Sequence, residues 1–161
     1  MEKAVLELNN AYAEELSYLD YGQLRWLVEH AFHARRVGDL DGFLLAFDES
    51  AEYRSPNYLW FRQRYPRFVY VDRVVITPGA RRRGLARSLY MDLFCKARRA
   101  GREIVGCEVN VAPPNPTSDA FHVSLGFSER GRAVANQKLV RYLVRPLDAR
   151  VAKKDEREES G

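Results

Sequence analysis

The sequence predicts a mixed α/β fold, and two patterns together with the composition carry this prediction. Residues 68–111 pass through a strand pattern, a helix pattern and a second strand pattern, which predicts a right-handed βαβ unit with parallel strands. Residues 127–147 hold two strand patterns around a turn near Asn136, which predicts an antiparallel hairpin. The chain has 161 residues, of which 46% are hydrophobic and 12% aromatic. We therefore expect one domain with its own core over residues 1–147, and a charged, disordered or frayed tail over residues 148–161.

The first elements are predicted from short local patterns. Residues 4–8 favour a short strand, which Asn9 is expected to end. Asp20 and Gln23 match the capping box that begins many helices. Apolar residues follow them at helical spacing, so a helix is predicted over residues 21–33.

The next stretch combines two strands with an unusual mixture of side chains. Residues 35–37 and the nearly continuous apolar run 42–47 are predicted to be strands, the second of them buried on both faces. Residues 51–67 mix aromatic side chains with arginines, and residues 57–64 suggest a short helix. Such a mixture can bind single-stranded nucleic acid, or it can form the rim of a substrate site. We prefer a cap over the core with its arginines in water, and expect no nucleic acid partner.

Histidine and cysteine are too sparse to predict a metal centre or a disulfide framework. His30 and His33 lie three residues apart on the predicted helix, but no cysteine or carboxylate is placed beside them, so no metal is expected. Cys95 and Cys107 are isolated and indicate a reducing compartment. No signal peptide and no membrane span are apparent, so the chain is expected to be soluble and cytoplasmic, without a membrane partner.

One loop suggests a function, because it joins the strand at residues 68–76 to the helix at residues 84–100 through Arg81, Arg82, Arg83 and Gly84. A strand that leads into a helix in this way directs backbone N–H groups and the helix dipole at one point, which attracts an anion such as phosphate. Arginines supply directed donors for phosphate oxygens, and glycine lets a ligand approach the main chain. Considered alone, the loop is equally well explained as a solvated basic turn.

The loop resembles the acyl-CoA pyrophosphate loop of the GNAT superfamily of N-acetyltransferases. The pattern Arg81-x-x-Gly84-x-Ala86, preceded by Ile76-x-Pro78, is similar to the family's Gln/Arg-x-x-Gly-x-Gly/Ala. The resemblance implies acetyl-CoA as cosubstrate, held through main-chain donors of the loop, with arginines to neutralise the pyrophosphate. The residues implied to bind it are Val74, Ile76, Arg81, Arg82, Arg83, Gly84, Leu85, Ala86, Arg87, Asn115, Ser118 and Phe121.

A second motif supports the same family. Residues 115–127 resemble the family's Asn-x-x-Ala-x-x-Leu-Tyr-x-x-x-Gly-Phe, with Asn115, a small residue three positions later, and Gly-Phe at its end. Asn115 also suits a helix N-cap, with Pro116 in the first helical position. The family's Tyr, proposed as general acid toward the departing thiolate, is here His122. The resemblance implies a GNAT-type mixed, mostly antiparallel central sheet of six to seven strands with a central parallel pair, flanked by helices, and allows a homodimer.

Two carboxylates are the candidate general bases. Glu108 and Asp72 lie on the two strands that the family separates to admit the thioester. A lysine-type amine is neutral in only about one molecule in 10³ at pH 7, so a base matters most for such substrates. The alternatives are that Asp72 pairs with Arg73 and that Glu108 is solvated. His122 has an ordinary pKa of about 6.5, so it could protonate the thiolate, or it could merely pack.

The sequence therefore predicts an acetyl-CoA-dependent N-acetyltransferase that acylates a primary amine of a small molecule or peptide directly. The alternative is a catalytically weak or inactive acyl-CoA-binding regulatory module, suggested by the replacement of the family's Tyr. The candidate catalytic residues are His122, Glu108 and Asp72.

Overall fold

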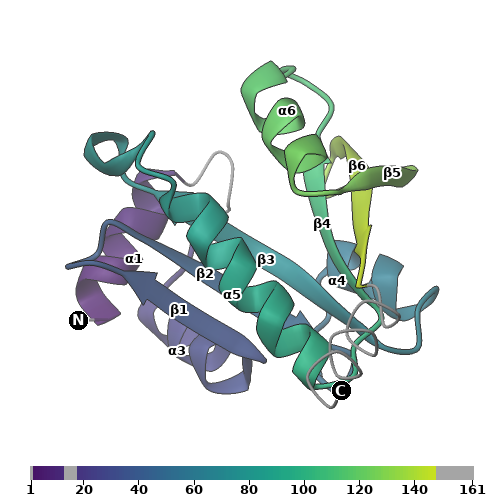
Figure 1. Ribbon diagram of the computed structural model, residues 1–161. Helices are drawn as coiled ribbons and strands as arrows, with labels where there is room; N and C mark the ends of the chain where they lie inside the picture. The colour runs from purple at the N-terminus through teal and green to yellow at the C-terminus, as the bar shows by residue number, and fades with distance from the viewer. Residues whose placement is uncertain (1, 13–17, 148–161) are drawn as a thin grey trace, which may run out of the picture. The chain divides into compact units, whose positions relative to one another are not determined.

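A computed structural model describes residues 2–12 and 18–147. Its helices are α1 (Glu2–Ala11), α3 (Tyr21–His30), α4 (Pro56–Arg62), α5 (Leu85–Arg99) and α6 (Pro116–Ser124), with a short 3-10 helix, η1 (Pro78–Ala80). Its strands are β1 (His33–Val37), β2 (Gly42–Asp48), β3 (Phe68–Ile76), β4 (Ile104–Asn110), β5 (Ser128–Ala135) and β6 (Lys138–Pro146) (Figure 1). The tail that the sequence predicts over residues 148–161 lies outside the described residues.

The strands form one mixed sheet in the order β1-β2-β3-β4-β6-β5. β3 and β4 are parallel, whereas β1 with β2, β4 with β6, and β5 with β6 are antiparallel. This confirms the predicted mixed sheet with its parallel pair, at six strands among the described residues. The chain divides into two compact units, one from Met1–Ala51 with Val71–Leu93 and the other from Glu52–Tyr70 with Phe94–Gly161. β3 and α5 contribute to both units, and the single domain expected over residues 1–147 stays a prediction.

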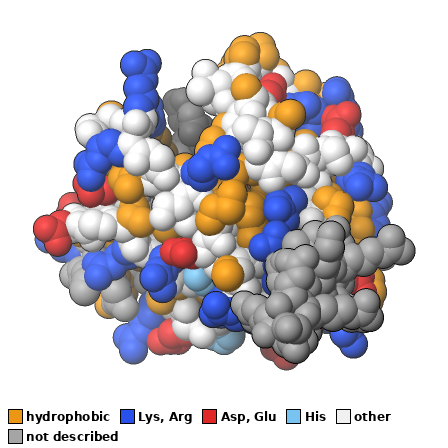
Figure 2. Space-filling view, in the orientation of Figure 1, with side chains coloured by type: hydrophobic (Ala, Val, Ile, Leu, Met, Phe, Trp, Pro, Cys, Tyr) orange, Lys and Arg blue, Asp and Glu red, His pale blue; other side chains and the backbone are white. Residues whose placement is uncertain are grey.

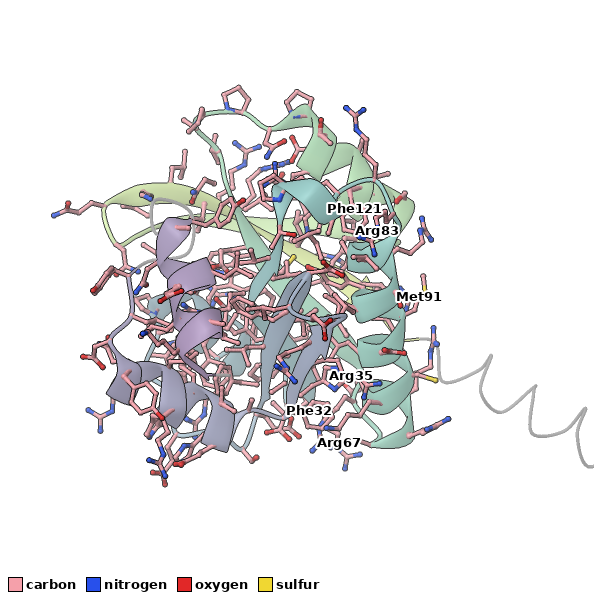
Figure 3. The ribbon with its side chains drawn as sticks, turned by 90° about the vertical axis from the view of Figure 1, so that its left-hand side faces the viewer. Phe32, Arg35, Arg67, Arg83, Met91 and Phe121 are labelled. Atoms are coloured by element: carbon pink, nitrogen blue, oxygen red, sulfur yellow. The ribbon has the colours of Figure 1, made fainter. Side chains whose placement is uncertain are left out.

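In the first unit, helices cover both faces of β1 and β2. Figures 1 and 3 agree that α1 and α3 lie on one face and the beginning of α5 on the other. The predicted capping box of α3 is present, with both of its hydrogen bonds between Asp20 and Gln23 formed. Gly42 permits close packing of β2, because a Cβ there would lie 2.5 Å from the carbonyl oxygen of Val75. Leu89 and Leu93 of α5 are fully buried, as their four-residue spacing predicts.

Two predictions for the first unit were wrong. Residues 4–8 belong to α1 rather than to a strand, and Val5 and Asn9, four residues apart, are its buried positions. Asn9 was expected to end a strand, but its side chain is buried in the fold, where it accepts a hydrogen bond from Arg73 at 2.9 Å. Helix α3 ends at His30 rather than at the predicted residue 33. His33 is instead the first residue of β1, so the two histidines do not share a helix. Within the described ranges, no cluster of three or more potential metal ligands is found.

The second unit packs α4 and α6 with β4, β6 and β5. Gly106 of β4 faces α4, because a Cβ at this position would overlap the ring of Phe61. The β5–β6 hairpin turns through Asn136 and Gln137, where the sequence predicted a turn, and both residues have positive φ. α6 begins at the predicted N-cap, where the Asn115 side chain accepts a hydrogen bond from the Ser118 N–H. None of the described helices has the length and apolar character needed to span a membrane.

Candidate functional site

The loop between β3 and α5 is an exposed turn with an unusual backbone. Arg82 and Gly84 have φ values of 67° and 73°, in the left-handed region that favours glycine. A Cβ at Gly84 would have no heavy atom within 4 Å beyond its own chain neighbours, so the space over this residue is open. α5 begins directly afterwards at Leu85, and the first N–H groups of a helix have no acceptor within it. The loop therefore offers main-chain donors to open space at a helix N-terminus.

The loop arginines are exposed, and two of them make contacts with other residues. Arg81 donates to the Ile76 carbonyl at 3.4 Å, and its guanidinium lies 5.7 Å from the ring centre of Tyr12. Arg83 forms an exposed ion pair with Asp41 at 3.6 Å. Figure 2 shows Lys and Arg side chains projecting at the upper left, where Figure 1 draws this loop, and Figure 3 places Arg83 near the beginning of α5. The positive charge of the loop is thus turned toward solvent, where an anion can reach it.

Asp72 is part of a buried ion pair in the first unit. Arg73 donates from Nε to Asp72 Oδ2 at 2.6 Å, and the two side chains are only 4% and 5% exposed. Arg73 also donates to the buried side chain of Asn9. This is the structural alternative that the sequence left open for Asp72. The Asp72 carboxylate is therefore already held by a cation inside the fold.

Glu108 belongs to a different kind of cluster, in the second unit. It lies on β4 directly opposite Tyr142 of β6, so the two side chains share a face of the sheet. Asn57 is the second residue of α4, and its Nδ2 donates to Glu108 Oε1 at 3.1 Å. The Tyr142 hydroxyl donates to Asn57 Oδ1 at 2.9 Å. A carboxylate, an amide and a phenol therefore form one continuous hydrogen-bonded chain.

Tyr142 is held firmly in this cluster. The residue is 1% exposed, and its ring stacks on Trp60 with 4.2 Å between centroids and 11° between planes. Burial, together with the charge of Glu108, raises the pKa of Tyr142, while Arg64 acts in the opposite direction. The phenol accordingly stays protonated at neutral pH and remains a hydrogen-bond donor.

His122 lies on α6 and is only 9% exposed. Its Nδ1 is 2.7 Å from the Ser118 carbonyl oxygen, an atom that can only accept, so the proton of the neutral ring lies on Nδ1. Its ring meets Phe121 and Phe127 edge to face. Burial lowers the pKa of His122. The hydrogen bond to the Ser118 backbone and the charge of Asp119 raise this pKa by smaller amounts, and Arg141 has the smallest effect, which lowers it. This differs from the ordinary pKa assumed from the sequence, and a neutral ring is a poor acid at pH 7.

The structure brings together some of the predicted site residues and adds two residues, Asn57 and Tyr142, to the candidate site. Residues 81–87 form one loop and helix turn, and Asn115, Ser118, Phe121 and His122 lie together on α6 and its cap. Val74 and Ile76 lie at half-exposed positions of β3. The sequence did not indicate Asn57 or Tyr142, whose contact joins residues 85 positions apart. No local motif marks either residue, and the sequence indicated only that Asn57 begins a suggested helix and that Tyr142 lies on a predicted strand.

The fold and the two motifs define an acetyltransferase of the GNAT class. The family model for the GNAT acetyltransferases matches residues 7–127, and the chain therefore belongs to this family, as the motif resemblance predicted. The comparison with curated proteins gave no match.

Solved structures show the same fold at low sequence identity. Ard1 from Thermoplasma volcanium is 14% identical with a TM-score of 0.67, over 92% of this chain and 94% of that one. Naa20 from Chaetomium thermophilum, in complex with a bisubstrate analogue, is 16% identical with a TM-score of 0.66, over 91% and 84%. The protein yncA from Salmonella typhimurium, with its cofactor acetyl-CoA, is 18% identical with a TM-score of 0.63, over 92% and 89%.

Proposed function

We propose that this protein is an acetyl-CoA-dependent N-acetyltransferase that acylates a primary amine of a small molecule or peptide. The observation that carries the proposal is the conformation and setting of Gly84. This residue has a positive φ and open space around it, and it lies between exposed arginines and the first turn of α5. A pyrophosphate needs main-chain donors, positive charge and room for close approach, and this loop supplies all three. Membership of an acetyltransferase family supports acetyl-CoA as the ligand.

We assign binding of acetyl-CoA to residues of the loop, of β3 and of α6. The main-chain N–H groups of residues 82–86 donate to the pyrophosphate, while Arg81, Arg83 and Arg87 balance its charge. The backbone of Val74 and Ile76, at the end of β3, is assigned to the pantetheine arm. The α6 residues Asn115, Ser118 and Phe121 are assigned to the same arm, and the capping role of Asn115 leaves its amide nitrogen available for a second contact.

We assign the general base to Glu108 rather than to Asp72. The ionised carboxylate of Glu108 takes a proton from the ammonium form of the substrate, whose neutral nitrogen then attacks the thioester carbonyl carbon. The tetrahedral intermediate collapses as the C–S bond breaks and CoA leaves as a thiolate. The nitrogen releases its second proton to solvent and the sulfur gains one from solvent. Glu108 then returns its proton to solvent, so the products are an amide, CoA and one net proton.

His122 is assigned a supporting role. Its lowered pKa argues against proton donation at neutral pH, and its Nδ1–H is directed at the Ser118 carbonyl within α6. It therefore stabilises the helix that carries Asn115, Ser118 and Phe121. This revises the role of acid that the family resemblance implied for this position.

The proposal is tested by incubating the protein with acetyl-CoA and a panel of amines. The panel includes peptide α-amines, lysine side chains and polyamines, and both the release of CoA thiol and the mass of the product are measured. We expect at least one class to gain about 42 Da, the net change when an acetyl group replaces a hydrogen atom on nitrogen. Saturable acetyl-CoA binding with no acetylated product in any class would instead indicate a regulatory acyl-CoA-binding module.

A further inference from the structure

We propose that Asn57 and Tyr142 are positioning residues for Glu108, forming a relay in which the phenol fixes the amide and the amide fixes the carboxylate. This inference rests on the proposed function, because it assigns a role in catalysis to residues outside both motifs. It concerns only contacts within the second unit, where α4, β4 and β6 each contribute one residue.

The three residues face one another because of strand register and packing. Glu108 and Tyr142 are cross-strand partners, and side chains alternate along β4, so Gly106 and Glu108 point to the same face. Gly106 faces Phe61 of α4, which places Glu108 on the face covered by that helix. Asn57, one turn earlier on α4 than Phe61, is thereby brought to the carboxylate.

The direction of the hydrogen bonds is fixed by chemistry. An ionised carboxylate only accepts, so Asn57 must present its Nδ2–H group to Glu108. The amide oxygen of Asn57 then points the other way and accepts from the Tyr142 hydroxyl. If the amide rotated by 180°, its oxygen would face the carboxylate and its nitrogen would face the phenol. The carboxylate therefore selects the orientation of the amide, and the Tyr142 hydroxyl, which can donate or accept, holds Asn57 in place by binding the end of the amide that faces away from Glu108.

The far end of the relay is anchored by aromatic packing. Besides its stacking on Trp60, the Tyr142 ring meets Phe61 edge to face with 5.6 Å between centroids and 89° between planes. Gly131 on β5 makes room for Trp60, because a Cβ there would lie 2.7 Å from its ring. A buried ring held on two sides cannot swing its hydroxyl away from Asn57. This rigidity is what a positioning residue requires.

The titratable and charged groups around Glu108 are compatible with such a role. Tyr142 faces it from β6, and its pKa is raised by burial and by the charge of Glu108. Cys107 is adjacent on β4, and burial, with the same charge, raises the pKa of its thiol. Arg64, two residues beyond the end of α4, lowers the pKa of Tyr142 and lies over the Trp60 ring at 4.2 Å. Both Tyr142 and Cys107 thus stay neutral through the range in which a carboxylate titrates.

The relay predicts a specific dependence on pH. A hydrogen bond donated to the charged form of an acid favours that form, so removing it raises the pKa of the acid. We expect Asn57→Leu to move the titration midpoint of Glu108 upward by about 1 pH unit, the equivalent of a charge-assisted hydrogen bond. Tyr142→Phe should move it in the same direction by about half as much, because the amide remains but is no longer held.

The test combines a direct titration with enzyme kinetics. The carboxyl carbon of Glu108 is followed by ¹³C NMR in the full chain, with the signal assigned by its loss in Glu108→Gln. The acid limb of the kcat/KM profile is measured for the same variants with whichever amine is acetylated. Gln63→Leu is the matched control, because it makes a similar amide-to-leucine change at the exposed residue just after α4. We expect Asn57→Leu to move the midpoint and the acid limb together, and Gln63→Leu to move neither.

Double-variant kinetics and the NMR midpoints supply further tests of the relay. In a Glu108→Gln background, Asn57→Leu should lower kcat by less than about 2-fold, since residues that act through one another are not additive. An NMR midpoint unchanged in both Asn57→Leu and Tyr142→Phe, in folded protein, would overturn the relay whatever the activity. A midpoint that moves without the acid limb would show that Glu108 is not the base, which also overturns the inference. Absence of acetyl transfer by the wild type would be a failure of the proposed function, and the NMR titration distinguishes that failure from one of the relay.

Discussion

The loop between β3 and α5 and the Asn57–Glu108–Tyr142 relay are built in opposite ways. The loop is exposed and is distinguished by its backbone shape, with left-handed conformations at Arg82 and Gly84. The relay lies against buried aromatic rings and consists of side chains that three separate elements hold in place. The first suits reversible binding of a large anion, and the second suits a reaction that needs one atom at a fixed position.

Because of this difference, mutations can separate acetyl-CoA binding from catalysis. Changes in the loop should weaken acetyl-CoA binding and leave the pH profile unaltered. Changes in the relay should alter kcat and the pH profile and leave acetyl-CoA binding unaltered.

The largest effect is expected from removing the base. Glu108→Gln keeps the shape and a hydrogen-bonding group but cannot take a proton, so kcat should fall about 10²–10³-fold for a lysine-type amine. The dissociation constant of acetyl-CoA, measured by calorimetry, should stay within about 2-fold of the wild type. A kcat that is unchanged at saturating substrate would remove Glu108 from the mechanism.

The second-largest effect is expected from Gly84→Val, which should weaken acetyl-CoA binding about 100-fold. The β-branched side chain is strained at positive φ, and it fills the open space over the loop. Gly101→Val is the matched control, because Gly101 has a similar φ of 74° and a similarly open Cβ position but follows the other end of α5. Equal losses of affinity in the two variants would mean that the effect is general destabilisation.

Neutralising the loop arginines should give a smaller effect. Arg81→Gln and Arg83→Gln should each weaken acetyl-CoA binding about 3- to 10-fold, since these side chains are exposed and screened by solvent. The loss should shrink as salt is raised, and calorimetric titrations at two salt concentrations measure this. Arg36→Gln, an exposed arginine of β1, is the control and should change neither quantity. An effect of Arg36→Gln equal to that of Arg81→Gln would indicate nonspecific attraction.

The smallest effect concerns His122 and the stability of the second unit. Burial lowers the pKa of His122 in the folded state, so below pH 6.5 the unfolded state binds more protons than the folded state. The wild type should therefore lose stability as the pH falls from about 6.5 toward the lower folded-state pKa. Denaturant titrations at several pH values should show a weaker loss in His122→Phe. An equally steep decline in both proteins would mean that His122 does not carry this dependence.

Features that depend on neighbouring residues could be predicted from the sequence. Contacts between residues far apart in the chain could not. The Asp20 capping box, the Asn115 cap and the bounds of β3 follow from neighbouring residues, and all three are confirmed. Residues 4–8 were wrongly predicted because Asn9 is buried by a contact with Arg73, which lies 64 positions further along. Asn57 was missed for the same reason, since its partner Glu108 lies 51 positions away.

The electrostatic properties of the candidate residues also depend on tertiary structure. The ordinary pKa assumed for His122 ignored the burial that lowers it. The pairing of Asp72 with Arg73 was available as an alternative because the two residues are adjacent, but its burial was not. Motifs therefore located the candidate residues, whereas their burial and partners determine which proton each of them can move.

The most direct test of the central claim is a calorimetric titration of the full chain with acetyl-CoA, alongside CoA and ATP. We predict saturable binding that prefers acetyl-CoA, is lost in Gly84→Val and is retained in Gly101→Val. No binding of any of the three ligands to the folded wild type would show that residues 81–86 are only a basic turn. The assignment of this protein as an acetyl-CoA-dependent enzyme would then be wrong.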